Sequence, residues 1–264
     1  MIRMMRADAY RVIQDKALYI ALSILIAVVA LVAFVFQSVP DVLLMFLWVL
    51  DGDALSTGFT DGAAAAQMAL FLIPGLTFLF LPLFRAVTIG SQDGVMKNEI
   101  SAGFSRIQLY LSKWLLSSLL SMVYVLIFFA LTVLSTATIS GFGDWNNGMF
   151  AGILRALGMQ LLFVMGFNSI GVFLSFLFKK AYVVVEVYLF ALLMPVFISI
   201  LFGLVDSPAG DLLRFLCLTT QATTLAPISG VQQADIVTGL LVGLAFIVIL
   251  NAIGVFRFKK AEIK

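Results

Sequence analysis

The chain has 264 residues, of which 62% are hydrophobic and 11% are charged, and its formal net charge is +2. Soluble domains carry roughly a quarter of their residues as charged side chains, so this composition excludes a water-soluble globule and predicts an all-α integral membrane protein. The sequence has no histidine and one cysteine, Cys217. This removes the commonest metal ligand and general base, and also internal disulfides and cysteine metal clusters. We therefore expect no catalytic site, no metal site and no cofactor bound by the chain itself.

The N-terminal segment, residues 1–17, is predicted to be a helix that lies in the membrane interface. Apolar side chains recur there at helical spacing with basic side chains between them. The apolar set is Ile2, Met5, Ala9, Val12 and Ile13, and the basic set is Arg3, Arg6, Arg11 and Lys16. A basic flank that only fixes the orientation of the first span is the alternative interpretation.

Six apolar stretches are each about long enough to cross a bilayer, and we treat residues 1–264 as one transmembrane domain. The predicted spans are residues 18–36, 68–89, 115–138, 149–178, 181–205 and 236–256. Pro74 and Pro82 predict a kink in the second span. Two longer polar segments, residues 41–67 and 206–235, are expected on one side of the membrane. Within the second of them, the apolar residues 212–218 are too few to cross, and we expect a helix or helical hairpin there that dips into the membrane.

The polar break between the second and third spans, residues 91–114, has more local structure than a simple loop requires. Residues 95–102 are predicted to form a short helix that ends at Gly103. Ser105 and Gln108 match the S-x-x-Q capping box. In this motif the serine side chain accepts a hydrogen bond from the glutamine backbone N–H, and the glutamine side chain accepts one from the serine backbone N–H. The sequence therefore predicts a short helix, a sharp corner and a new helix that continues into the third span.

The distribution of charge predicts the orientation. All but three of the 16 basic residues lie in the N-terminal segment, the polar break, the Lys179-Lys180 pair and the C-terminal tail. The remaining three are Arg85, Arg155 and Arg214. The segments on the other side carry aspartates, namely Asp41, Asp51, Asp53, Asp61, Asp144, Asp206, Asp211 and Asp235. The positive-inside rule then places both termini in the cytoplasm.

Three ionisable side chains, Arg85, Arg155 and Glu186, lie within predicted spans but near their ends. Intramembrane charge commonly marks a functional site. A structural role is the alternative, because a side chain near a span end can reach a headgroup or a nearby partner. The sequence contains no G-x-x-x-x-G-K-[ST] motif, so the chain cannot itself hold ATP in a P-loop.

The polar break resembles the segment between the second and third spans of type-2 ABC exporter permeases, which include lantibiotic-immunity and bacitracin-type permeases. The matching residues are Gly94, Lys97, Asn98, Ile100, Ser101, Gly103, Ser105, Arg106, Tyr110, Leu111, Ser112 and Lys113. The rest of the resemblance is the layout of interfacial helix, six spans, longer outer segment and basic tail.

The resemblance implies a permease of the bacterial plasma membrane that moves an amphipathic substrate such as an antimicrobial peptide, a drug or a lipid. Two copies of a separate ATPase subunit would bind ATP and magnesium, and a second permease copy or paralogue would complete the complex. Residues 95–102 would be the coupling helix that sits in a groove of the ATPase. The expected coupling residues are Gly94, Val95, Lys97, Asn98, Glu99, Ser101, Gly103, Ser105 and Arg106. No nucleic-acid partner is implied.

Three other functions are consistent with the sequence. A secondary transporter or channel not driven by ATP would need charged or ion-coordinating groups at mid-membrane and usually internal repeats, and neither is evident. An intramembrane enzyme could use a Ser-Lys pair, because the chain is serine-rich, but it would have neither a histidine nor a carboxylate pair to work with. A membrane anchor or sensor that only docks a partner would share the polar break but would transport nothing.

Overall fold

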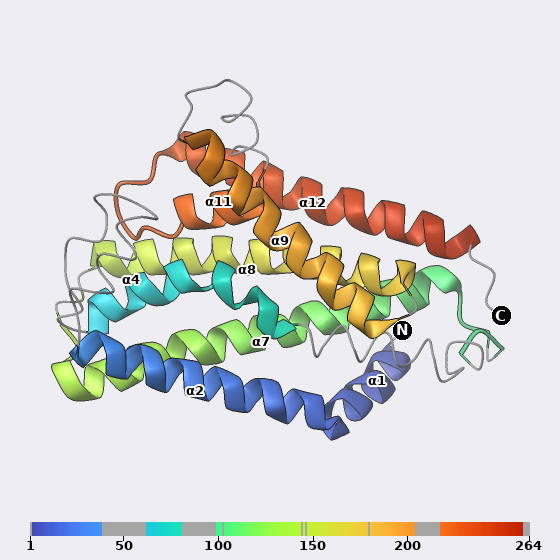
Figure 1. Ribbon diagram of the computed structural model, residues 1–264, viewed down its shortest axis with the longest axis horizontal. Helices are drawn as coiled ribbons and strands as arrows, with labels where there is room; N and C mark the ends of the chain where they lie inside the picture. Colours follow the sequence, from blue (N-terminus) through green and yellow to red (C-terminus); the bar gives the residue numbers. More distant parts are fainter. Residues whose placement is uncertain are drawn as a thin grey trace.

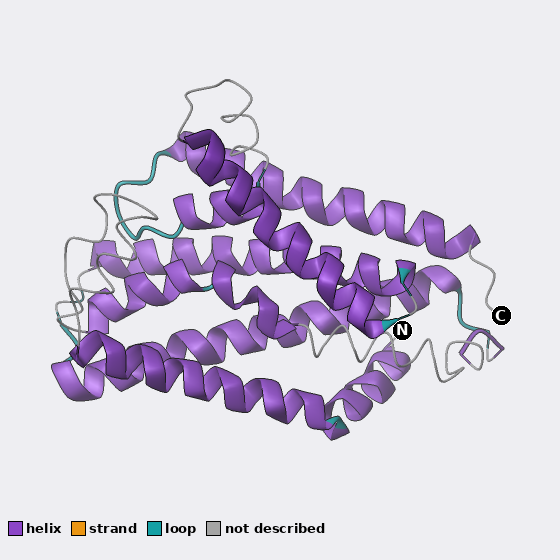
Figure 2. Cartoon of the chain, in the orientation of Figure 1, coloured by secondary structure: helices purple, strands orange, loops and turns teal. Residues whose placement is uncertain are grey.

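The computed structural model describes residues 2–38, 62–80, 99–101, 103–143, 145, 147–178, 180–203 and 217–260. These residues are almost entirely helical and include no strand, which confirms the all-α prediction (Figure 2). The elements in chain order are α1 (Ile2–Gln14), α2 (Lys16–Ser38), α4 (Gly62–Leu72), the 3₁₀ helix η1 (Pro74–Phe80), α7 (Arg106–Ser140), α8 (Asn147–Leu177), α9 (Ala181–Gly203), α11 (Leu218–Thr224) and α12 (Gln233–Lys260).

Three of these helices, α7, α8 and α12, are long and apolar enough to cross a membrane. A fourth is added if α1 and α2, which meet at a bend of 64°, are counted as one broken span. Several long apolar helices identify a protein built to be embedded in a membrane. The number six stays a prediction.

The second predicted span begins earlier than expected and changes its helix type. Residues 63–67 were assigned to a loop, but they are helical because α4 begins at Gly62 and packs its small alanine face against α7; Ala65 and Ala66 are fully buried. Proline has no N–H and cannot continue an α-helix, and at Pro74 the chain becomes the 3₁₀ helix η1. The break expected at Pro74 is therefore confirmed. Pro82 and Arg85 lie outside the described residues.

The segment before the last helix contains a short helix, α11, on the polar run LTTQATT. Of the apolar stretch 212–218 in which a helix was predicted, residues 212–216 lie outside the described range. The threonine hydroxyls donate to backbone oxygens within the helix, Thr223 and Thr224 both to Thr220 O, at 2.9 and 2.8 Å. Leu218 and Ala222 are buried. Hydroxyls satisfied by the backbone let a polar sequence pack as a helix against apolar neighbours.

Neutral polar side chains join α7, α8 and α12 inside the bundle. Ser117 Oγ donates to Asn168 Oδ1 at 3.0 Å. Trp114 Nε1 donates to Ser169 Oγ at 2.9 Å, and Asn251 Nδ2 donates to the same oxygen at 3.1 Å. Hydrogen bonds of this kind hold transmembrane helices together where the hydrophobic effect provides no driving force between them.

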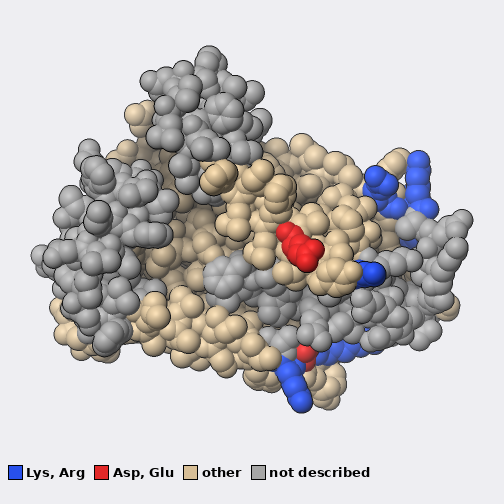
Figure 3. All heavy atoms as spheres, viewed as in Figure 1, with Lys and Arg blue, Asp and Glu red and all other residues tan. Residues whose placement is uncertain are grey.

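The starts of α1 and α7 and the ends of α8 and α12 gather at one end of the molecule, on the right in Figure 1. Lysine and arginine side chains are visible mainly at this end of the face drawn in Figure 3. We call it the basic end. The opposite end, with the start of α8, α11 and the loop 225–232, is called the far end. Both ends of the described chain lie at the basic end (Figure 1).

Candidate functional site

The corner predicted at Gly103 is present. Glu99–Ser101 is helical, and Gly103 has a φ of 90°, a backbone conformation that favours glycine. Two backbone bonds close the turn: Gly103 N donates to Ile100 O at 3.0 Å, and Phe104 N donates to Glu99 O at 3.3 Å. We call the described residues from Glu99 to Arg106 the elbow.

The capping box that follows is also confirmed. Gln108 N donates to Ser105 Oγ at 3.2 Å, and Ser105 N donates to Gln108 Oε1 at 3.3 Å. Both bonds satisfy amide groups that a helix start otherwise leaves unpaired. The helix α7, which begins at Arg106, is 35 residues long. A capped start of this kind joins the elbow firmly to the longest helix described.

Charged side chains of α1 connect it to both sides of the elbow. Lys113 Nζ of α7 lies 2.9 Å from Asp8 Oδ2, and both side chains are buried, at 4% and 7% exposure. Arg11 Nη1 lies 3.5 Å from Asp8 Oδ1 and 3.6 Å from Glu99 Oε1. The four side chains therefore form a chain of ion pairs, Lys113–Asp8–Arg11–Glu99, which we call the ionic cluster.

The structure adds contacts that the sequence does not indicate. Lys113, in the polar break, is buried because Asp8 supplies a partner within the fold. Glu99, predicted as a coupling residue, is 13% exposed and faces Arg11. Sequence reasoning missed Asp8 altogether. Its only local signal is the spacing of three residues to Arg11, which places both on one face of α1.

The elbow is also tied to the end of α12. Arg106 Nη1 donates to Lys259 O at 3.0 Å and to Phe258 O at 3.4 Å. The last carbonyls of a helix have no partner within the helix and carry its negative partial charge, so an arginine there is favourable. The first residue of α7 thus holds the last turn of α12.

The predicted coupling residues are only partly described. The structure places Glu99, Gly103, Ser105 and Arg106 together at the elbow, with Ser101 exposed beside them. Gly94, Val95, Lys97 and Asn98 lie outside the described residues. The described residues contain no group of three Cys, Asp or Glu side chains that could hold a metal ion.

The other two ionisable groups flagged by the sequence differ from one another. Arg155 Nη2 donates to Pro227 O at 2.7 Å and to Ile228 O at 3.0 Å, so it holds the loop of the far end rather than reaching headgroups. Glu186 is exposed on α9. Arg155 thus has backbone partners, and Glu186 has no ion pair among the described residues.

A scan against protein-family models found no match for this chain, and a search of curated proteins found none either. The functional argument therefore rests on the residues and contacts described above.

Proposed function

We propose that this chain is the membrane-spanning permease subunit of an ATP-driven ABC exporter. It would cross the bacterial plasma membrane six times with both termini in the cytoplasm, and it would move an amphipathic substrate such as an antimicrobial peptide, a drug or a lipid. It would pair with a second permease copy or paralogue, and residues 95–102 would dock on each of two separate ATPase subunits. The resemblance of the polar break to type-2 ABC exporter permeases is the origin of this proposal.

The elbow is the single observation that supports it best. A subunit driven by a separate motor needs a docking element joined stiffly to a membrane-crossing helix. The corner at Gly103, the Ser105 cap and the long helix α7 provide such a joint. The ionic cluster and Arg106 connect the same joint to α1 and α12. A displacement at Glu99 would therefore be transmitted to three helices at once.

The most direct test is whether an ATPase accompanies the chain. The full chain, expressed from its native genomic context and purified in mild detergent, should copurify with a protein that carries a Walker A motif. In proteoliposomes the complex should hydrolyse ATP and accumulate substrate. Transport that follows a proton or sodium gradient without any ATPase would replace this proposal with a secondary transporter or channel. A complex that hydrolyses ATP but transports nothing would favour a docking anchor or sensor.

Glu99→Lys and Gly103→Pro should uncouple ATP hydrolysis from transport. Lysine at 99 would repel Arg11, and proline cannot adopt the positive φ of Gly103 or donate its N–H to Ile100. Substrate-stimulated ATPase activity should fall several-fold while the far-UV circular dichroism spectrum is unchanged. Normal stimulation in both variants, with the ATPase present, would contradict the proposal.

A variant of its partner separates the two roles that Glu99 could have. Arg11→Gln removes the cation that faces Glu99 and leaves the carboxylate in place. Loss of stimulation in this variant would show that Glu99 acts through α1. Normal stimulation would show that the carboxylate contacts the ATPase instead. Lys259→Glu, a charge reversal at an exposed residue of the same end, is the matched control.

A further inference from the structure

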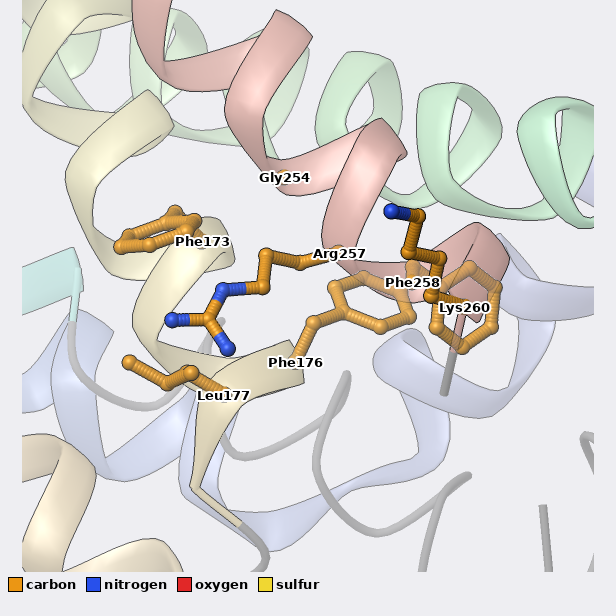
Figure 4. Close-up of a pocket in the computed structure, with 7 residues that line it drawn as sticks. All are labelled: Phe173, Phe176, Leu177, Gly254, Arg257, Phe258 and Lys260. Atoms are coloured by element: carbon orange, nitrogen blue, oxygen red, sulfur yellow. The ribbon is translucent and has the colours of Figure 1, made fainter. Parts of the chain in front are cut away.

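A cavity of about 280 Å³ opens between the ends of α8 and α12, at the basic end. Its lining is aromatic and aliphatic on the α8 side, from Phe173, Phe176 and Leu177, and basic on the α12 side, from Arg257 and Lys260. In Figure 4 the guanidinium of Arg257 reaches from α12 toward Phe173 and Leu177 of α8. The cavity therefore combines a cationic rim with an apolar wall.

The two cations at this rim have no acidic partner in the part of the chain that the structure describes. The ion pairs there involve only Arg11 and Lys113 as cations. Arg257 forms no hydrogen bond with a described residue, and the Lys260 ammonium lies 4.3 Å from the centroid of the Phe256 ring. By contrast, the Lys113 ammonium of α7 is neutralised by Asp8. Among the described residues, no acidic side chain neutralises the positive charge at the cavity.

The place of the cavity decides the kind of ligand. Both helices have apolar bodies that continue toward the far end, and each ends at a basic sequence. This is the level at which lipid headgroups meet a membrane protein, and basic pockets between transmembrane helices bind the headgroups of anionic lipids. A guanidinium can hold two phosphate oxygens at once, while an ammonium adds a point charge.

We propose that this cavity is a binding site for one anionic phospholipid of the leaflet at the basic end. Its phosphate is held by Arg257 and Lys260, and its glycerol and the first part of one acyl chain lie against Phe173 and Leu177. A volume of about 280 Å³ is too small for a whole lipid, so the rest of the chains lies outside. Exposed apolar side chains continue there along α12, including Phe256 and Ile253.

The site shares its wall with the elbow. The Phe258 ring packs edge-on against Phe176 with centroids 4.6 Å apart, and Phe176 packs against Tyr110 of α7 at 4.8 Å. Arg106 of the elbow holds the Phe258 and Lys259 carbonyls. A lipid that bridges α8 and α12 therefore stabilises the helix end to which the elbow is attached. The site itself requires only a membrane protein and does not depend on coupling to an ATPase.

Native mass spectrometry of the full chain in detergent, titrated with phosphatidylglycerol or phosphatidylcholine, tests the site. We expect one phosphatidylglycerol molecule to bind saturably and at least tenfold more tightly than phosphatidylcholine. Arg257→Gln/Lys260→Gln should weaken phosphatidylglycerol binding roughly tenfold or more, because both basic side chains attract the anionic headgroup and this variant removes both charges. Phosphatidylglycerol should raise the Tm of the unaltered chain but not of this variant.

A matched control removes the same charge from the same end. Lys180→Gln/Lys259→Gln takes away two exposed lysines that do not line the cavity, and it should change the affinity by less than twofold. An equal loss in both double variants would reduce the effect to general electrostatic attraction and overturn the site.

Two further experiments test where the lipid binds and whether the phosphate belongs to a lipid. Leu177→Trp fills the cavity without changing charge, because Leu177 is 41% exposed and lies at its wall; it should abolish the preference for phosphatidylglycerol. Retention of that preference would overturn the proposed position of the lipid. Inorganic phosphate at millimolar concentration should not displace phosphatidylglycerol, and displacement would identify a site for free phosphate instead.

Discussion

The two ends of the bundle are held together by different chemistry. At the basic end, charged side chains of separate elements pair with one another, as in Asp8–Lys113 and Arg11–Glu99. At the far end, side chains of regular helices bind the backbone of the loop 225–232. Arg155 contributes two such bonds, and Gln67 bonds to that loop in both directions, accepting from Ile228 N at 2.8 Å and donating to Ala226 O at 3.4 Å.

This difference has consequences for movement. At the far end the side chains bind backbone carbonyls, whose positions are fixed by the loop. The backbones of α8 and of this loop are in close contact, because a Cβ added at Gly152 would meet the Ile228 carbonyl. At the basic end, Asp8 accepts from two cations, and Glu99 Oε2 has no hydrogen-bond partner among the described residues. The Arg11 side chain is 54% exposed, so its ion pairs with Asp8 and Glu99 can exchange partners, whereas the Asp8–Lys113 pair is buried and the far-end side chains bind backbone carbonyls. The contacts of Arg11 are therefore the part of the basic end that can rearrange.

The largest effect is expected at the buried ion pair. Asp8→Leu leaves the Lys113 ammonium buried without its partner, which costs about 3–5 kcal/mol in the free energy of unfolding. Asp8→Leu/Lys113→Met should recover most of this loss, because apolar residues of similar volume often replace a buried pair without cost. Unfolding in detergent, followed by circular dichroism, measures both. A double variant no more stable than the single one would show that Lys113 does not depend on Asp8.

The next effect is expected at the far end. Arg155→Ala removes the donor for the Pro227 and Ile228 carbonyls. A fully buried acceptor left unpaired costs about 1–3 kcal/mol, and because these two contacts are part-buried we expect a loss near the lower end of that range. The measured loss of stability should be the same at low and high salt, since these partners carry no net charge. Arg6→Ala, which removes an arginine from an exposed position of α1 at the other end, is the control. A strongly salt-dependent loss for Arg155→Ala would contradict the distinction between the two ends.

The smallest effect is expected at the helix start beside the elbow. Ser105→Ala removes the side-chain acceptor for Gln108 N, and loss of such a cap costs about 1 kcal/mol. Ser105→Asp should retain most of the stability, because aspartate is a comparable cap and its charge favours the start of a helix. Hydrogen exchange at the Gln108 amide would report the change locally. Unaltered exchange in Ser105→Ala would exclude the cap as the element that fixes the elbow.

The features that could be predicted from the sequence are those set by neighbouring residues. Gly103, Ser105 and Gln108 specify a corner and a helix start within six residues, and the structure has both. Of the predicted spans, residues 115–138, 149–178 and 236–256 coincide with α7, α8 and α12, the helices long and apolar enough to cross a membrane, because apolar length alone defines such helices.

The features that could not be predicted depend on contacts between distant segments. Asp8 and Lys113 are 105 residues apart, and nothing local indicates which side of α1 faces α7. For Arg155 the sequence left open a functional role or a structural one, and the partners that it binds in the structure lie more than 70 residues further along the chain. A long side chain near a span end therefore need not reach the headgroups, because a distant backbone segment can lie beside it and bind it.

The helix type of η1 sets its length. A 3₁₀ helix rises about 2.0 Å per residue and an α-helix about 1.5 Å, so the seven residues of η1 extend about 3–4 Å further than they would in α geometry. Tyr188 of α9 donates from its hydroxyl to the Thr77 carbonyl at 3.4 Å. One tyrosine on a neighbouring helix is thus bonded to the part of the chain whose length depends on its helix type.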